Sequence, residues 1–176
     1  RAVGNPEKRF CEDALRILRA FRFSAQLSFE IEETTLTGCA DSKSGLTKVA
    51  KERIAAEFLR LLLSGEPILP LKQMIETGVS SYVFGEYVPS VALLDRLPQM
   101  PATDVARLGF FFSESSEERT KELLETLRYS KKQITGALAV ARGASGHIAN
   151  PVEARRFAAS CGIYAEDACR ASVLWG

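Results

Sequence analysis

Helical spacing of apolar residues runs along nearly the whole chain and constrains its fold more than any other feature. Counting from Ile54, the apolar residues Phe58, Leu61 and Leu62 follow at four, seven and eight positions, which is the pattern of a buried helix face. No stretch of useful length alternates apolar and polar residues as a half-buried strand does. The sequence therefore predicts an all-α fold.

Residues typical of helix ends divide this pattern into short segments. Asn5-Pro6 and Asn150-Pro151 each place a capping side chain before a proline suited to the first helical position. Ser115 and Glu118 have the capping-box spacing. Residues 79–87 are mixed, and they predict either a loop or a short extended piece. We expect helices over 5–27, around Leu36 before a loop at 38–45, through Ile54 to Ser64-Gly65, and over 69–77, 90–97, 103–112, 117–129, 131–142, 151–160 and 165–174.

Composition and length limit the domain organisation. The 176 residues are 46% apolar and carry a net charge of +1, which suits one or two globular domains and excludes a globally basic nucleic-acid binder. The break at Ser64–Pro70 predicts a boundary between residues 1–65 and 66–176. The sequence contains no run of 18 or more apolar residues, so it predicts no membrane span. Because the chain opens at Arg1 without a signal-peptide pattern, we expect a piece of a longer cytoplasmic protein.

The cysteines and the histidine do not form a recognisable metal or catalytic pattern. Four cysteines occur without a C-x-x-C pair, and His147 is the sole histidine. A structural zinc site needs four nitrogen or sulfur ligands at close paired spacings. We interpret the cysteines as reduced thiols that mostly fill the core, His147 as a loop residue, and Phe110-Phe111-Phe112 as core.

The first helix separates apolar from charged residues. At 100° per residue, Phe10, Ile17 and Phe21 share one arc, and the charged residues occupy the opposite half. A solvated face with ion pairs is the simplest interpretation of such charges. However, Leu15 and Phe23 lie on the charged side, and arginine offers a planar fork of donors suited to bases and phosphates. We therefore expect nucleotide binding along a ridge that rises about 13 Å and consists of Asp13, Arg16, Arg19 and Arg22.

These residues also carry a family resemblance. The segments Gly4-Asn-Pro-Glu-Lys-Arg-Phe10, Glu12-Asp-Ala-Leu-Arg16 and Ile17-Leu-Arg-Ala-Phe-Arg-Phe23 resemble the neck of class II tRNA nucleotidyltransferases. These are the CCA-adding enzymes, which are related to bacterial poly(A) polymerases. The resemblance covers about the first 65 residues strongly and the later helices loosely. It implies a neck over 1–65 and a helical body over 66–176, with room for the start of a tail.

The resemblance implies a role for each charged residue of this helix. Asp13 and Arg16 would act as a protein template for the base, Arg19 and Arg22 would contact bound ATP or CTP, and Glu12 and Arg9 would support them. Cytosine and adenine each present an amino donor beside a ring-nitrogen acceptor, which matches a carboxylate that accepts and a guanidinium that donates. Uracil and guanine reverse both groups, and each lost hydrogen bond costs about 1–3 kcal/mol.

The chain departs from the family in the polar, loop-like segment Thr37–Leu46 and in lacking the catalytic head. The family's catalytic head carries a Gly-Ser motif and a D-x-D pair for Mg²⁺, and this sequence contains no Asp-x-Asp. We therefore expect the isolated chain to be inactive, with CTP, ATP and the tRNA 3′ end as partners of the full-length enzyme. The oligomeric state is left open. Two alternatives also stay open, namely the same region of a bacterial poly(A) polymerase and a stand-alone helical module that binds RNA or a protein partner.

Overall fold

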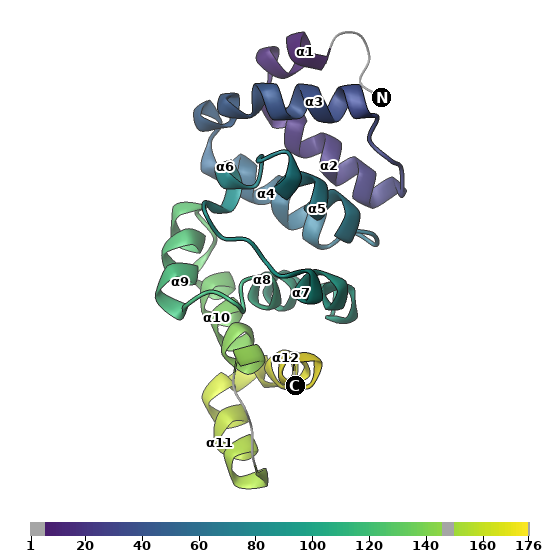
Figure 1. The fold of residues 1–176 in the computed structure, drawn as a ribbon. Helices are drawn as coiled ribbons and strands as arrows, with labels where there is room; N and C mark the ends of the chain where they lie inside the picture. Colours follow the sequence, from purple (N-terminus) through teal and green to yellow (C-terminus); the bar gives the residue numbers. More distant parts are fainter. Residues whose placement is uncertain (1–5, 146–149, 176) are drawn as a thin grey trace. The chain divides into compact units, whose positions relative to one another are not determined.

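The computed structural model describes residues 6–145 and 150–175, and each regular element within those ranges is a helix (Figure 1). The predicted all-α fold is therefore confirmed. Two residues that the sequence singled out, Asn5 and His147, lie outside the described residues. None of the helices in the described ranges is long and apolar enough to cross a membrane.

Two compact units divide the chain between Val88 and Pro89. The first unit contains α1 (Pro6–Glu12), α2 (Leu15–Leu27), α3 (Glu33–Ser42), the 3₁₀-helix η1 (Lys43–Lys48), α4 (Lys51–Leu62), α5 (Ile68–Glu76) and α6 (Ser81–Phe84). The second contains α7 (Val91–Arg96), η2 (Leu97–Gln99), α8 (Asp104–Phe111), α9 (Glu117–Thr126), α10 (Lys131–Ser145), α11 (Pro151–Cys161), η3 (Gly162–Tyr164) and α12 (Ala165–Trp175).

This division lies further along the chain than the break that the sequence suggested at 65–66. The helices α5 and α6 belong to the first unit because α5 packs against α2, and α6 packs against α4 and η1. The separate assignment of nucleotide recognition to residues 1–65 and of a helical body to 66–176 concerns function and stays a prediction.

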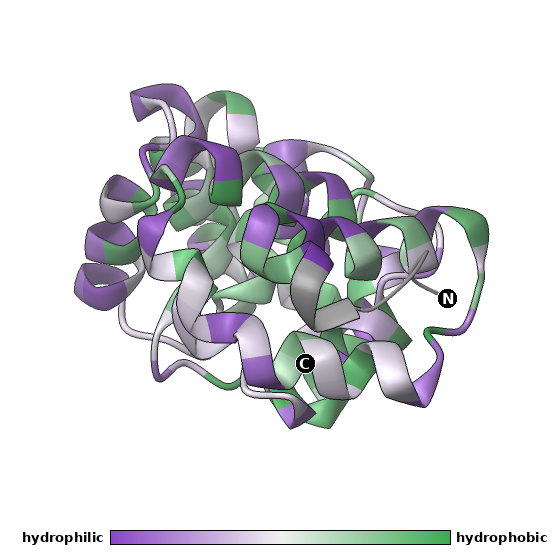
Figure 2. Cartoon of the chain, turned by 90° about the horizontal axis from the view of Figure 1, so that it is seen from above, coloured by the Kyte–Doolittle hydropathy of each residue, from purple (hydrophilic) through white to green (hydrophobic). Residues whose placement is uncertain are grey.

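Helix α2 lies at the centre of the first unit. It packs against α4 and α5, while α1 packs against α3. Its residues Ile17, Leu18 and Phe21 are fully buried, as the apolar arc of the sequence predicts. Figure 2 shows hydrophilic and hydrophobic residues together on individual helices, as expected of amphipathic helices that each bury one face.

Two segments of the first unit differ from the prediction. The expected loop at 38–45 is helical, because Thr35, Gly38 and Cys39 are buried along one face of α3, and such small residues give little apolar signal. Within 79–87, α6 forms where Phe84 is buried, with its ring centroid 5.4 Å from that of Phe58. Tertiary packing decides both segments.

In the second unit, α10 packs against α8 and α12. Phe110, Phe111 and Phe112 are fully buried, so their predicted place in the core is confirmed. The Asn150 side chain accepts bonds from the backbone N–H groups of residues 152 and 153, which confirms the predicted cap. The predicted cap at Ser115 is wrong, because the neighbouring Ser116 caps α9.

Candidate functional site

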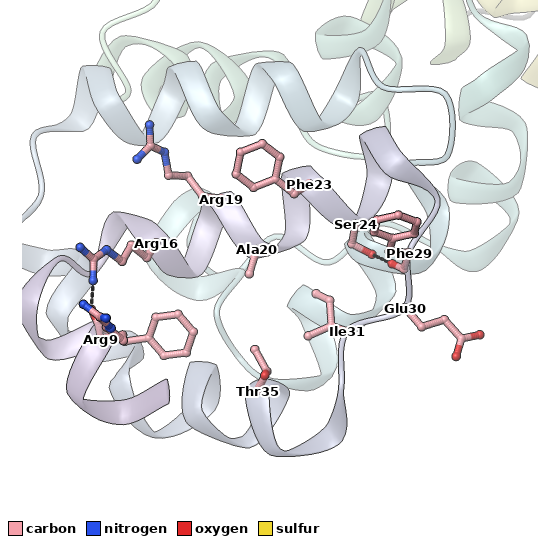
Figure 3. A pocket seen from close by; sticks show the side chains of 11 residues that line it. Arg9, Arg16, Arg19, Ala20, Phe23, Ser24, Phe29, Glu30, Ile31 and Thr35 are labelled. Carbon is pink, nitrogen blue, oxygen red and sulfur yellow. Dashed lines mark hydrogen bonds between the residues drawn. The ribbon is translucent and has the colours of Figure 1, made fainter. Parts of the chain in front are cut away.

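A cavity of about 530 Å³ opens in the first unit between α1, α2, the start of α3 and the segment between α2 and α3 (Figure 3). Cationic and aromatic side chains lie side by side in its lining. Arginine can pair with phosphates or base edges, and aromatic rings can stack on bases. The lining residues are Arg9, Phe10, Arg16, Arg19, Ala20, Phe23, Ser24, Phe29, Glu30, Ile31 and Thr35.

The turn at the end of α2 brings the ring of Phe29 to this cavity. Ser28 adopts a left-handed φ of 54°, and the chain turns back so that the Ser24 hydroxyl donates to the carbonyl of Phe29 at 2.5 Å. Phe23 on α2 and Phe29 after the turn are 47% and 67% exposed. Both rings therefore leave a large apolar surface uncovered; Phe23 lies next to Arg19, whereas Phe29 lies at the opposite end of the cavity from Arg9 and Arg16 (Figure 3).

The predicted single helix over residues 5–27 is interrupted at Asp13 and Ala14. Helix α1 ends at Glu12 and α2 begins at Leu15. The Asp13 Oδ1 atom accepts a hydrogen bond from the Leu15 backbone N–H at 3.2 Å, and aspartate is a residue that favours helix starts over helix interiors. The continuous ridge from Asp13 to Arg22 is therefore wrong, because Asp13 stands at the start of α2 rather than within it.

Packing reinforces this interruption. A Cβ atom on Gly45 of η1 would lie 2.9 Å from the Ala14 Cβ, so η1 approaches the junction as closely as a glycine allows. Asp13 itself does not line the cavity, although it is next to the part of α2 that does.

Across the junction, Glu12 links two of the four predicted arginines, Arg9 and Arg16. Its Oε2 atom lies 3.4 Å from Nη1 of Arg9 and 3.1 Å from Nη1 of Arg16. The Arg16 guanidinium also donates to the Arg9 backbone carbonyl at 3.2 Å (Figure 3). Each of these exposed ion pairs contributes little stability on its own, but together they hold Arg9 and Arg16 at one end of the cavity.

Arg22 takes a different place from its two predecessors on α2. At 100° per residue, Arg19 lies about 60° around the helix from Arg16, and Arg22 lies about 120° around it. Arg22 is therefore turned away from the cavity. Its Nε atom lies 3.1 Å from Oε2 of Glu57 on α4, and its guanidinium lies 4.1 Å from the centre of the Phe23 ring.

Glu57 is the site residue that the sequence did not single out. Its helix alternates glutamates with basic residues, which suggested a mixed solvated surface. Yet the Glu57 side chain is 5% exposed and also lies 3.6 Å from Arg19 and 3.3 Å from Arg60. Its position beside the apolar face formed by Ile54, Phe58 and Leu61 is the sequence pattern from which its burial could have been predicted.

The six predicted site residues thus fall into two groups. Arg9, Arg16 and Arg19 line one cavity, while Glu12, Asp13 and Arg22 lie outside its lining and contact the chain around it. In the described ranges, no three His, Cys, Asp or Glu side chains gather as they would around a metal ion.

Comparison with known proteins identifies the family. Residues 28–92 match the family model described as "Probable RNA and SrmB-binding site of polymerase A". A CCA-adding enzyme of Enterococcus faecalis is 37% identical over 142 residues, which cover 78% of this chain and 32% of that enzyme. The chain spans about a third or less of the curated relatives it matches.

Solved structures agree with the fold. A CCA-adding enzyme in complex with CTP matches with a TM-score of 0.57 at 24% identity, over 77% of this chain and 36% of that one. The Thermotoga maritima CCA-adding enzyme in complex with tRNA matches with a TM-score of 0.65 at 18% identity, over 95% and 45%. The sequence relatives, the family model and the shared all-helical fold lead to one conclusion: the chain belongs to the family of CCA-adding enzymes and poly(A) polymerases and matches a helical region of its members.

Proposed function

We propose that this chain is the nucleotide-recognising and RNA-binding region of a cytoplasmic tRNA nucleotidyltransferase, which adds C and A to tRNA 3′ ends from CTP and ATP. The observation that carries the proposal is a single cavity whose lining combines three arginines, Arg9, Arg16 and Arg19, with the exposed rings of Phe23 and Phe29. The similarity to CCA-adding enzymes, among them one solved with CTP and one solved with tRNA, supports it.

In this proposal, Asp13 and Arg16 select the base. The Asp13 carboxylate accepts from the exocyclic amino group of cytosine or adenine, and Arg16 donates to the neighbouring ring nitrogen. One Asp13 oxygen already accepts from Leu15, which fixes the carboxylate at the start of α2 and leaves its second oxygen for the base. Arg9 and Glu12 support Arg16 through their ion pairs.

Arg19 and Arg22 complete the proposed set in different ways. Arg19 lines the cavity and contacts the nucleotide directly. Arg22 does not line the cavity and acts indirectly, because its guanidinium pairs with Glu57, which also contacts Arg19. The Mg²⁺ that phosphoryl transfer uses would be held by residues of the full-length protein other than those described.

The test measures which nucleotides the full-length protein adds to a tRNA that lacks its CCA end. Arg16→Ala and Asp13→Ala each remove one of the two hydrogen bonds that distinguish C and A from U and G. At about 1–3 kcal/mol per bond, each change should lower kcat/KM for CTP and ATP by roughly tenfold. The difference in kcat/KM between these nucleotides and UTP or GTP should become smaller.

Arg53→Ala is the matched control, because Arg53 is an exposed arginine of the same unit that does not line the cavity. It should leave base selection unchanged. If Asp13→Ala and Arg16→Ala proteins still added C and A normally and rejected U and G, the template assignment would be wrong.

Poly(A) tailing is a second candidate, favoured by the match of residues 28–92 to a model named for polymerase A. Both functions use ATP, so the same assay separates them by C addition. A poly(A) polymerase would extend RNA with ATP alone and would not incorporate C.

A further inference from the structure

The side chain of Glu57 is an unusual feature of the surface where α2 packs on α4. It is a carboxylate with 5% exposure, and three guanidiniums from two helices lie within 4 Å of its oxygens. A buried charge is tolerated only with close partners of opposite charge. Three cations around one anion are more than burial alone requires, which suggests that the carboxylate also orients the arginines.

The two carboxylate oxygens of Glu57 have different partners. Oε2 lies 3.1 Å from the Arg22 Nε atom, and the Arg22 side chain is only 11% exposed. Neither atom makes a hydrogen bond to a described residue, so this buried ion pair holds the carboxylate between α2 and α4 through charge attraction. Oε1 is directed to the two arginines that reach solvent, with Nε of Arg19 at 3.6 Å and Nη1 of Arg60 at 3.3 Å.

Arg19 connects this cluster to the cavity. It is 48% exposed and lines the cavity, yet its Nε atom faces Glu57. Figure 3 shows the Arg19 side chain extending from α2 away from Arg16 and Arg9. Since the contact to Glu57 uses Nε, the terminal nitrogens of the guanidinium are left for a ligand. Anchoring a long side chain in advance lowers the entropy lost when it binds.

We infer that Glu57 is a positioning residue for nucleotide binding, which holds Arg19 at the edge of the cavity while Arg22 fixes Glu57 from the buried side. This inference rests on the proposed function, in which Arg19 contacts the nucleotide. It assigns to α4, a helix that contributes no lining residue to the cavity, a part in setting the affinity for CTP and ATP.

The experiment uses the full-length protein and measures KM and kcat for CTP and ATP together with thermal unfolding. Glu57→Gln keeps the shape of the side chain and removes its charge. We expect it to raise KM about three- to tenfold with kcat within twofold. Arg19→Ala should raise KM by at least as much, and the double variant should match Arg19→Ala, because Glu57 acts through Arg19.

Arg60→Gln is the matched control, since Arg60 pairs with the same oxygen of Glu57 but does not line the cavity. It should leave the KM for both nucleotides within twofold. Should Glu57→Gln fail to fold, Glu57→Asp keeps the buried charge but shortens its reach from α4 toward α2 by one methylene, and KM should again rise.

Two results distinguish a failure of the Glu57 positioning role from a failure of the proposed nucleotide-binding function. A folded Glu57 variant with unchanged KM, or a double variant whose effects simply add, overturns the positioning role and leaves the nucleotide site intact. An unchanged KM in Arg19→Ala instead contradicts the proposed contact between Arg19 and the nucleotide, and the inference falls with it.

Discussion

The four cysteines show how strongly the surroundings of a single residue set its chemistry. All four are free thiols, with Cys39 and Cys161 buried, Cys169 half-buried and Cys11 exposed. The predicted core role is thus confirmed for the two buried cysteines and wrong for Cys11. Burial raises the pKa of the Cys39 thiol from 9.0 to about 12, because the thiolate would be poorly solvated inside the first unit.

This difference predicts selective labelling. At pH 8, iodoacetamide should modify Cys11 and leave Cys39 unmodified until the protein is unfolded, since only the thiolate reacts. Mass spectrometry of peptides from native and unfolded protein checks the outcome, with Cys11→Ser as the control that removes the fast site. Rapid modification of Cys39 in the folded protein would contradict its burial.

The same pKa gives a direction for stability. Because the folded state favours the protonated thiol, the contribution of Cys39 to stability is complete below the unfolded pKa near 9.0. It is lost as the pH rises from there through the folded pKa of about 12. Neutral pH therefore lies within the range where this contribution is fully present.

Among the helices, α8 and α10 approach each other closely at Gly109. A Cβ atom on Gly109 would lie 2.6 Å from the Val140 Cβ and would also meet the backbone carbonyl oxygen of Ala137. Backbone atoms cannot move aside as a flexible side chain can. The helices α8 and α10 are therefore held at a distance that only glycine permits at this position.

Gly109→Ala should accordingly lower the free energy of unfolding by about 2 kcal/mol or more, because overpacking forces the two helices apart. Gly65→Ala is the control, since a Cβ on Gly65 would meet no atom within 4 Å. It should be neutral or stabilise by about 0.4–1 kcal/mol through the unfolded chain. Urea unfolding measures both values, and equal effects of the two substitutions would contradict the close-packing argument.

For the whole molecule, the division between Val88 and Pro89 gives each half its own hydrophobic core. The first unit buries Phe21, Phe58 and Phe84, and the second buries Phe110, Phe111 and Phe112. A segment with its own core can fold as an independent domain. The pattern break at Ser64–Pro70 lies within the first unit and does not separate the cores.

We therefore expect residues 1–88 and 89–176, expressed separately, each to be helical and to unfold cooperatively. Circular dichroism and thermal unfolding of the two pieces and of the intact chain provide the measurement. A cut at 65–66 is the matched comparison, and its N-terminal piece should unfold at a lower temperature because it lacks α5 and α6. A stable 1–65 piece beside an unstable 1–88 piece would contradict this division.

The sequence alone was sufficient for those features that depend on neighbours along the chain. Apolar spacing predicted the all-helical fold and the buried arc of Ile17, Leu18 and Phe21. Asn150 caps its helix as predicted, because the capping bonds reach only two or three residues ahead. The contiguous segments around Asp13 and Arg16 likewise carried the family resemblance without any knowledge of the fold.

The tertiary structure decided which of the charged residues share a site. Residues 13, 16, 19 and 22 look equivalent along the chain, yet only Arg16 and Arg19 of these four line the cavity. Arg22, on the side of α2 turned from the cavity, pairs with Glu57, a residue far along the chain that meets it only when α2 packs on α4. Helical periodicity is local and is therefore encoded in the spacing of residues, whereas the pairing of a buried carboxylate depends on which helices pack together, which no local spacing specifies.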